Sequence, residues 1–311
     1  MIGMRWKINA AVILFFIWAC KHETNDVVEG VKTKYLIEAE ELKGIAQHPN
    51  IKIIDFRKKE IYEKEHIAGA LNIWRTDIEE TAYPYEGIMA SKIQIETLFG
   101  KLGIKTEDTI IVYDDNGLCE ASRLWWILQN YNFKNVKLLQ GGILEWKLNN
   151  GFVTTEIPEV NATIFKLTEH PKMQYHISKE QVVKALNNYT VILDTRSEDE
   201  FTGKRQKKGA FKAGRLSGSI HIDWAEAINY KGDMRFKSLV ELENIYSKLN
   251  VKKNDSIILY CHSGVRSAHT TFVLTQLLGY KNVKNYDGSW TEWSYFNDLP
   301  FEKDSITILS K

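Results

Sequence analysis

The segment Ser256-Ile257-Ile258-Leu259-Tyr260-Cys261-His262-Ser263-Gly264-Val265-Arg266-Ser267 decides the fold of this chain. Its apolar start predicts a buried strand that ends just before Cys261. The run from Val265 to Leu278 then predicts a helix. Gly264 lies in the short loop between them, where a residue without a Cβ lets the backbone turn tightly. A strand, a loop and a helix in this order are the building unit of an α/β protein.

The loop of this segment places one cysteine in surroundings that favour a thiolate. Backbone N–H groups at the start of a helix, together with the helix dipole, stabilise negative charge. Arg266 adds a positive charge nearby. A small buried core cysteine is the alternative interpretation, but the glycine and the arginine favour chemistry. Cys261 is therefore the predicted nucleophile.

The chain also contains an internal repeat, which divides it into two domains. Segments of the first half recur in the second: Ile110–Tyr113 as Ile257–Tyr260, Lys134–Lys137 as Lys281–Lys284, Asp55-x-Arg57 as Asp194-x-Arg196, and His66–Ala70 as Arg215–Ser219. We predict homologous domains at residues 34–155 and 172–311, joined by a linker at 156–171. Asp114 aligns with Cys261, so only the second domain carries the nucleophile. Cys119 is expected to be an ordinary helix residue.

Short apolar runs alternate with amphipathic stretches in both halves. This pattern predicts an α/β fold in which each domain is a parallel sheet flanked by helices. The expected strands are 51–55, 110–114, 136–139, 191–194, 256–260 and 283–286, and the expected helices include 38–46, 93–102 and 121–131. Ligands of such sheets bind beyond the carboxyl ends of the strands, which is where Cys261 lies.

Residues 1–20 have the layout of a secretory signal peptide. Two basic residues, Arg5 and Lys7, precede an apolar run that is too short to span a bilayer. The run ends at Ala19-Cys20, which resembles the lipobox of bacterial lipoproteins, where the cysteine is acylated. This predicts lipidation of Cys20, a polar tether at 21–33, and a membrane-anchored protein of the cell envelope. An ordinary signal peptide and a soluble periplasmic protein are the alternative.

The composition of the 311 residues excludes several classes of function. A net charge of +1 without a basic stripe gives no reason to expect nucleic acid as a partner. Three cysteines cannot form a disulfide framework in a chain this long, and no C-x-x-C or H-E-x-x-H spacing is present. We therefore expect no metal and no cofactor.

Together these motifs resemble those of tandem-domain rhodanese-type sulfurtransferases, the family of 3-mercaptopyruvate and thiosulfate sulfurtransferases. The resemblance covers about residues 34–305 and includes Tyr286–Trp290, a stretch typical of the second domain. It implies that Cys261 takes a sulfane sulfur from a small donor, becomes a persulfide, and passes the sulfur to a thiol or cyanide acceptor. The loop would hold the substrate through His262, Gly264, Val265, Arg266 and Ser267.

Ser263 points to one branch of this family. A Cys-x-Ser-Gly-Val loop resembles the mercaptopyruvate branch, which implies that 3-mercaptopyruvate is favoured over thiosulfate as donor. In that branch the serine works with a histidine and an aspartate of the first domain, which match His66 and Asp55 here. Such a relay could protonate the pyruvate enolate. The alternative is that His66 and Asp55 only hold the domain interface by hydrogen bonds.

One position departs from the family pattern. Members usually place an arginine a few residues after the second Asp-x-Arg to hold the anionic substrate, and this chain has Glu200 there. A carboxylate would repel an anionic donor. Arg205, in the basic run 204–208, and Arg215, which aligns with His66, are the candidates to replace it. A solvated surface loop is the other interpretation of that run.

Two other functions are weighed against sulfur transfer. A Cys-dependent phosphatase or arsenate reductase also uses a thiolate in a strand–loop–helix cradle closed by an arginine. Loops of that kind are longer, whereas only four residues separate Cys261 from Arg266, which suits a single sulfur atom. The second is a non-enzymatic, membrane-anchored binding module, and the intact cysteine loop argues against it.

Overall fold

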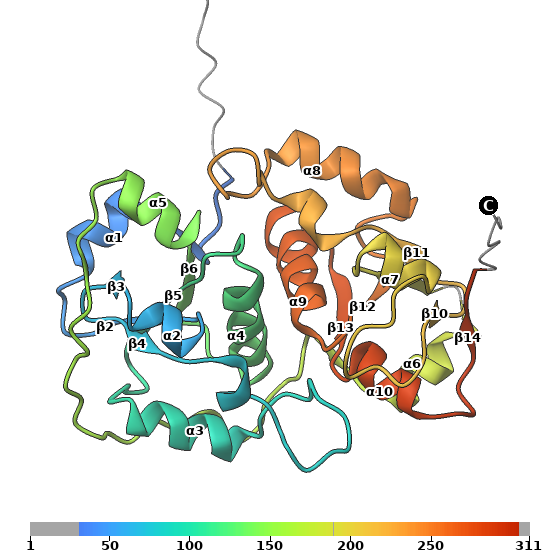
Figure 1. Cartoon of the computed structure of the whole chain (residues 1–311), viewed down its shortest axis with the longest axis horizontal. Helices are drawn as coiled ribbons and strands as arrows, with labels where there is room; N and C mark the ends of the chain where they lie inside the picture. The colour runs from blue at the N-terminus through green and yellow to red at the C-terminus, as the bar shows by residue number, and fades with distance from the viewer. Residues whose placement is uncertain (1–30, 189, 305–311) are drawn as a thin grey trace, which may run out of the picture.

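The computed structural model describes residues 31–188 and 190–304, which form two α/β domains side by side (Figure 1). The sheet of the first domain has the strand order β1-β6-β5-β2-β4, and that of the second has the order β11-β9-β12-β13-β8. All strand pairs within these two sheets are parallel. The strands are β1 (Leu36–Ile37), β2 (Ile51–Asp55), β4 (Leu71–Asn72), β5 (Thr109–Tyr113), β6 (Val136–Leu139), β8 (His176–Ile177), β9 (Val191–Asp194), β11 (Ile220–His221), β12 (Ser256–Tyr260) and β13 (Asn282–Tyr286).

Both faces of each sheet are covered by helices, which confirms the predicted fold class. Successive residues of a strand point to opposite sides. In β12, Ile257 and Leu259 therefore pack into a core that extends through both domains, whereas Ile258 and Tyr260 pack with residues of α6 and α10. The helices are α1 (Ala39–Ile45), α2 (Lys59–Tyr62), α3 (Lys92–Lys101), α4 (Cys119–Asn130), α5 (Gly142–Leu148), α6 (Lys179–Ala185), α7 (Glu198–Thr202), α8 (Leu239–Tyr246), α9 (Val265–Phe272) and α10 (Ser289–Tyr295).

Helices α4 and α9 lie side by side at the centre of the molecule and join the two domains (Figure 1). They follow β5 and β12, the counterpart strands of the internal repeat. Trp125 of α4 meets Phe272 of α9 edge to face, with the ring centroids 4.9 Å apart. Because a single hydrophobic core runs through this contact, the loops that precede both helices lie at the seam between the domains.

The helix expected from Val265 to Leu278 is not a single α-helix. The α-helix ends at Phe272, and Val273–Leu277 form a π-helical turn. Two threonine hydroxyls donate to carbonyls four residues earlier, from Thr271 to Ser267 at 2.8 Å and from Thr275 to Thr271 at 2.6 Å. Such bonds compete with the regular backbone ladder of a helix.

Two short antiparallel ribbons lie outside the main sheets and form another repeated feature. In the first domain β3 (His66–Ile67) pairs with β7 (Val153–Thr154). In the second domain β10 (Arg215–Leu216) pairs with β14 (Phe301–Glu302). In each ribbon, a strand near the C-terminal end of the domain pairs with the segment that follows β2 in the first domain or β9 in the second. His66 and Arg215 thus occupy equivalent places, and both places belong to a ribbon rather than to the ends of the sheet strands.

The N-terminal predictions fall outside the described residues. The signal peptide, Cys20 and most of the tether belong to residues 1–30. Within residues 31–188 and 190–304, none of the helices has both the length and the hydropathy that a membrane crossing requires.

Candidate active site

Cys261 directly follows β12, the central strand of the second sheet, and its side chain is almost completely buried. The loop is fixed by Ser289, at the start of α10. The Ser289 hydroxyl oxygen accepts hydrogen bonds from the backbone N–H groups of Cys261 (3.1 Å) and Gly264 (3.0 Å), and it donates to the Tyr286 carbonyl (2.7 Å). The Trp290 N–H donates to the Cys261 carbonyl at 3.0 Å. The stretch 286–290 therefore acts as a clamp that holds the cysteine loop in place.

The environment of Cys261 favours the thiolate. Burial alone would raise the pKa of the thiol, but the charge of Arg266, the hydroxyl and N–H of Ser267, and the N–H of Ser263 outweigh it, so that the pKa is lowered. No nitrogen or oxygen atom of the described residues pairs with the buried Ser267 hydroxyl, which leaves it available to the sulfur. The structure places Cys261 at the carboxyl end of a parallel sheet strand, as the sequence predicted; its role as a nucleophile stays a prediction.

The loop of the first domain that is equivalent to the cysteine loop surrounds a carboxylate. Asp114, which aligns with Cys261, is buried, and its carboxylate accepts hydrogen bonds of 2.8–3.0 Å from four backbone N–H groups: those of Asn116, Leu118, Glu120 and Ala121. Burial raises the pKa of Asp114 to about 6, although these hydrogen bonds oppose the shift. The repeat thus forms a cradle for an anion in both domains, filled by the carboxylate of Asp114 in the first. Burial raises the pKa of the nearby Cys119, so that this thiol is not activated.

Glu200 does not repel an anionic substrate as the sequence suggested, because its charge is paired. Two nitrogens of Arg266 donate to its carboxylate at 2.7 and 2.9 Å, and Arg205 donates at 3.1 Å. Although burial opposes ionisation, these bonds hold the pKa of Glu200 well below its usual range. The structure places Arg205 on Glu200 and outside the lining of the nearby cavity, and its contact with a substrate stays a prediction.

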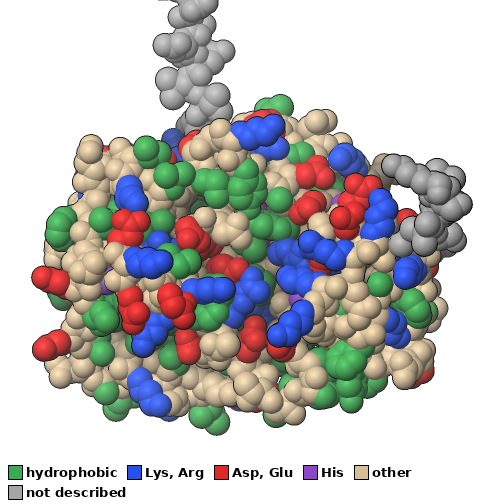
Figure 2. Space-filling model, viewed as in Figure 1, with side chains coloured by type: hydrophobic (Ala, Val, Ile, Leu, Met, Phe, Trp, Pro, Cys, Tyr) green, Lys and Arg blue, Asp and Glu red, His purple; other side chains and the backbone are tan. Residues whose placement is uncertain are grey.

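A cavity of about 440 Å³ adjoins the cysteine loop at the seam between the domains. Its cationic side chains come from both domains: Arg75 from the 3₁₀ turn Arg75–Asp77, and Lys207 and Lys208 from the basic run. Figure 2 shows Lys and Arg side chains gathered near the middle of this face. Arg75 is itself held by Glu120, to which its Nε donates at 2.6 Å. Glu79 and Glu86 also line the cavity, so Lys207 and Lys208 are the cations that could meet a small anion beside the thiol site.

His262 and Ser263 form the part of the cavity wall that is next to the buried thiol. The Nε2 of His262 lies 3.0 Å from the Lys208 carbonyl, which can only accept, so the ring carries its proton on Nε2. Burial, with Lys207 and Arg266 nearby, lowers the pKa of His262 to about 4, and the ring is neutral at pH 7. Its Nδ1 atom is buried and has no partner among the described residues.

The first domain holds the cysteine loop through Arg123 of α4. Its guanidinium donates to the Asp287 carboxylate at 2.7 Å and to the Gly87 carbonyl at 2.9 Å, with a longer contact of 3.4 Å to the Gly264 carbonyl. The Met89 N–H donates to the other oxygen of Asp287 at 2.9 Å. Arg123 and Asp287 are both buried, so this is an ion pair inside the seam. Sequence reasoning missed Arg123, because no local motif marks a buried arginine whose partner lies in another domain.

Gly87 explains how the two domains approach so closely. Its φ is +98°, and a Cβ on this residue would lie 2.5 Å from the Cβ of Ser263. Any side chain here would therefore push the first domain away from the cysteine loop.

The predicted relay from Ser263 through His66 to Asp55 is wrong. The Asp55 carboxylate is bound by the Arg57 guanidinium, with an Nη2–Oδ2 distance of 2.6 Å, and by the Tyr113 hydroxyl at 2.6 Å. The His66 ring nitrogens meet only backbone carbonyls, those of Tyr62 at 2.8 Å and Glu156 at 3.0 Å. None of these contacts reaches the cysteine loop. The two residues hold the first domain and the linker together.

The second domain contains the same construction, which gives the physical reason for this correction. Asp194 pairs with Arg196 and accepts from the Tyr260 hydroxyl at 2.6 Å, as Asp55 does with its own partners. Arg215 occupies the place of His66 and pairs with Asp304 at 2.7 Å and Glu302 at 3.3 Å. The prediction that Arg215 binds substrate is therefore also wrong. The side chains at these positions are engaged in contacts within each domain, and none of these contacts involves Cys261.

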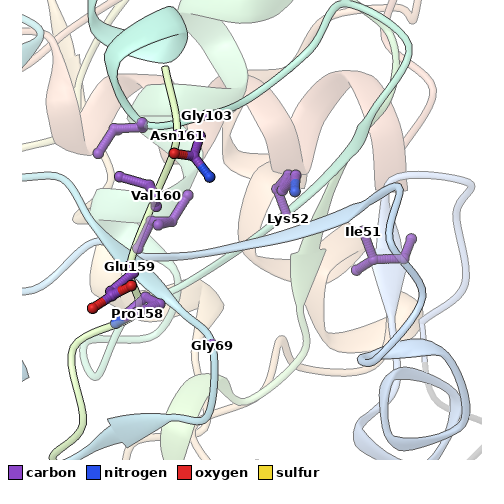
Figure 3. A pocket seen from close by; sticks show the side chains of 10 residues that line it. Ile51, Lys52, Gly69, Gly103, Pro158, Glu159, Val160 and Asn161 are labelled. Carbon is purple, nitrogen blue, oxygen red and sulfur yellow. The ribbon is translucent and has the colours of Figure 1, made fainter. Parts of the chain in front are cut away.

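Another cavity, of about 320 Å³, lies between the linker and the first domain (Figure 3). Its lining includes Ile51 and Lys52 at the amino end of β2, together with the linker residues 158–161. Cys261 lies at the carboxyl end of its own sheet, so this cavity has no part in the thiol site.

Comparison with known proteins agrees with the repeat. A model of the rhodanese-like domain matches residues 38–149 and again 178–295. A curated protein of Saccharopolyspora erythraea named "Putative thiosulfate sulfurtransferase" is 35% identical over 248 residues, which cover 78% of this chain and 86% of that protein. A protein of Mycobacterium bovis with the same name and the designation SseA is 33% identical over 266 residues, 83% of this chain and 87% of that protein.

Solved structures share the fold. SseA from Escherichia coli, a 3-mercaptopyruvate sulfotransferase, superposes with a TM-score of 0.72 at 24% identity, over 83% of this chain and 99% of that one. The anaerobic ergothioneine biosynthesis enzyme of Chlorobium limicola gives a TM-score of 0.76 at 19% identity, over 88% and 71%. Such identities establish the architecture alone. The family itself is shown by the two domain matches and by the curated relatives: this chain belongs to the rhodanese-like family, as a tandem-domain member of its sulfurtransferases, which are enzymes.

Proposed function

We propose that Cys261 carries sulfur as a persulfide between a small anionic donor and a nucleophilic acceptor. The observation that carries this proposal is the buried thiol of lowered pKa, faced by the backbone N–H groups of Ser263 and Ser267 and by the Arg266 charge. The same loop in the first domain binds the carboxylate of Asp114 through four N–H groups. A cradle of this kind stabilises an anionic persulfide as it does an anionic carboxylate.

With 3-mercaptopyruvate, the Cys261 thiolate attacks the sulfur of the donor. The carbon–sulfur bond breaks, and its electron pair remains on carbon as the pyruvate enolate. The enolate then takes the proton of the transferred S–H group, which leaves pyruvate and the anionic persulfide. With thiosulfate, the same attack breaks the sulfur–sulfur bond and releases sulfite. In the second half-reaction a thiolate or cyanide attacks the outer sulfur, and Cys261 leaves as the thiolate.

We infer that 3-mercaptopyruvate is favoured over thiosulfate. Thiosulfate is a dianion, and the two positions after Cys261 offer it no charge, because Ser263 is uncharged and His262 is neutral at pH 7. Arg266 is already paired with Glu200. The carboxylate of mercaptopyruvate carries a single charge, which Lys207 or Lys208 can meet in the cavity. Ser263 then acts directly on the donor, since His66 and Asp55 lie elsewhere.

The experiment compares the two donors on the purified protein. Steady-state rates with 3-mercaptopyruvate and with thiosulfate are measured against cyanide and against a thiol acceptor. Cys261→Ser should abolish both activities, and Cys119→Ser should change neither. A large advantage of thiosulfate would contradict the donor order, and no turnover of either donor would contradict the proposal. Release of phosphate from an aryl phosphate, lost in Cys261→Ser, would instead favour phosphatase chemistry.

We also propose that the protein is attached to a membrane of the cell envelope through acylated Cys20. The support is the sequence alone: the apolar run before Ala19-Cys20 and the polar segment after it. Metabolic labelling of the full chain with a fatty acid should mark the protein, and Cys20→Ala should remove the label and release the protein from the membrane fraction. Label that persists in this variant, or an unlabelled protein in the soluble fraction, would contradict the attachment.

A further inference from the structure

A second cavity at the domain seam has no role in the proposed sulfur transfer. Its volume is about 320 Å³, and it shares no lining residue with the cavity beside Cys261. The first domain contributes Tyr83 and Tyr85 to its wall, and the second contributes Tyr286 and Glu292. It is therefore a site that exists only when the two domains are packed together.

Glu292 is the unusual member of this wall. The residue is 9% exposed, and its Oε1 accepts a hydrogen bond of 3.0 Å from the Tyr85 hydroxyl of the other domain. Among the described residues, no Lys, Arg or His nitrogen lies within 4.0 Å of its carboxylate. Burial raises its pKa. Buried carboxylates in proteins are normally paired with a cation, because leaving the charge unpaired is costly.

Lys179 also lines this cavity and its charge lowers the pKa of Glu292, but its ammonium forms no ion pair with that carboxylate. Its ammonium lies 3.6 Å from the centroid of the Phe296 ring and 3.5 Å from an oxygen of the exposed Glu180. Asp287, the other acidic residue at the cavity, is already paired with Arg123. Glu292 is thus the buried carboxylate of this cavity that has no directly paired cation among the described residues.

A second buried polar group lies on the wall of the same cavity. The Tyr286 hydroxyl is fully buried on the cavity wall, and burial together with the neighbouring Glu292 carboxylate raises the pKa of Tyr286. The hydroxyl lies beside that carboxylate, but no described residue forms a well-aligned hydrogen bond with it. Buried polar groups without a partner are rare in folded proteins, and a ligand or an ordered water usually satisfies them.

The remaining wall is aromatic. Tyr83 and Tyr85 are stacked with ring centroids 5.5 Å apart, and Tyr85 meets Tyr295 at the same centroid distance. Aromatic faces attract cations and also accommodate the apolar part of a ligand. A buried carboxylate, an unpaired hydroxyl and tyrosine rings together form the surroundings that suit an organic ammonium ion.

We propose that this cavity binds a small organic molecule with a primary ammonium group. The ammonium donates to the free oxygen of Glu292 and to the Tyr286 hydroxyl, and the body of the molecule lies against Tyr83 and Tyr85. Because both domains contribute to the site, such a ligand stabilises their packing. The proposal goes beyond sulfur transfer and does not depend on it.

The test uses benzylammonium as the probe and benzyl alcohol, which is similar in shape but uncharged, as the matched ligand. Isothermal titration of the full chain should show saturable binding of benzylammonium, with an affinity at least about tenfold above that of benzyl alcohol. Glu292→Gln and Tyr286→Phe should each weaken the binding about tenfold or more. Glu243→Gln, which changes an exposed carboxylate on α8, should leave it unchanged.

Three results would overturn this site. They are the absence of saturable binding, equal binding of the uncharged alcohol, and binding that both Glu292→Gln and Tyr286→Phe leave intact. Tyr286→Phe keeps the test decisive if Glu292→Gln does not fold. Persulfide formation at Cys261 is measured on the same samples, so that a failure of ammonium binding is distinguished from a failure of the proposed sulfur transfer.

Discussion

Arg123→Met should destabilise the protein and slow its chemistry, because one guanidinium joins the domains and supports the cysteine loop. The substitution removes the contact of 2.7 Å to Asp287 and leaves that buried carboxylate with the Met89 N–H as its donor. Breaking a buried ion pair by removing one partner costs about 3–5 kcal/mol. The total stability of a domain is about 5–15 kcal/mol, so the loss is a large part of it.

Urea denaturation followed by tryptophan fluorescence measures this loss, and the rate of persulfide formation is recorded in the absence of urea. Arg123→Met with Asp287→Leu replaces both charges by apolar groups and should recover part of the stability, because no unpaired charge remains buried. Lys147→Met is the matched control, since it breaks an exposed pair with Glu65 and should cost at most about 1 kcal/mol. Two results would refute this role of Arg123. One is a decrease in the free energy of unfolding of less than about 1 kcal/mol in Arg123→Met. The other is a decrease in the double variant that equals the sum of the decreases in the two single variants.

Three further outcomes follow from the site. Ser267→Ala removes a hydroxyl that favours the thiolate, so the midpoint of iodoacetamide alkylation of Cys261 should move to higher pH. An unchanged midpoint would exclude that role. Asp114 has a folded-state pKa of about 6 against a usual 3.8, so its ionisation costs more in the folded state, and wild type should lose about 2 kcal/mol relative to Asp114→Asn as the pH rises from about 4 to about 6. Urea unfolding at both ends of this range checks it, and parallel pH profiles would contradict it. His66→Gln should leave the kcat of the folded enzyme unchanged, whereas loss of a proton relay would lower it about 10²–10⁴-fold.

The fold and the place of Cys261 at the end of a sheet strand could be predicted because their signals are local. The strand–loop–helix around Cys261 and its counterpart around Asp114 are each contained in a short segment, and the repeat shows them twice. The start of the helix after the loop could be predicted, but its end could not. There the hydroxyls of Thr271 and Thr275 bond to backbone carbonyls and divert the helix into a π-helical turn.

The remainder of the site depends on contacts between distant residues. The sequence suggested that Glu200 would repel an anionic substrate, because its partner Arg266 lies in another part of the sequence and the ion pair could not be foreseen. Arg123 could not be recognised for the same reason, since its partner Asp287 belongs to the other domain. Asp55 illustrates a different error: the second domain repeats its Asp-x-Arg pair, and a pair needed in both domains is more readily explained by stability than by catalysis.

The most direct test of the account is the location of transferred sulfur. The folded protein is treated with 3-mercaptopyruvate without an acceptor, and its intact mass and alkylated peptides are analysed by mass spectrometry. The protein should gain one sulfur atom, carried by the peptide that contains Cys261 and lost after a thiol is added. Cys119 should gain none, because it is buried and its pKa is raised. Sulfur found on Cys119, or no gain of sulfur at all, would contradict the central claim.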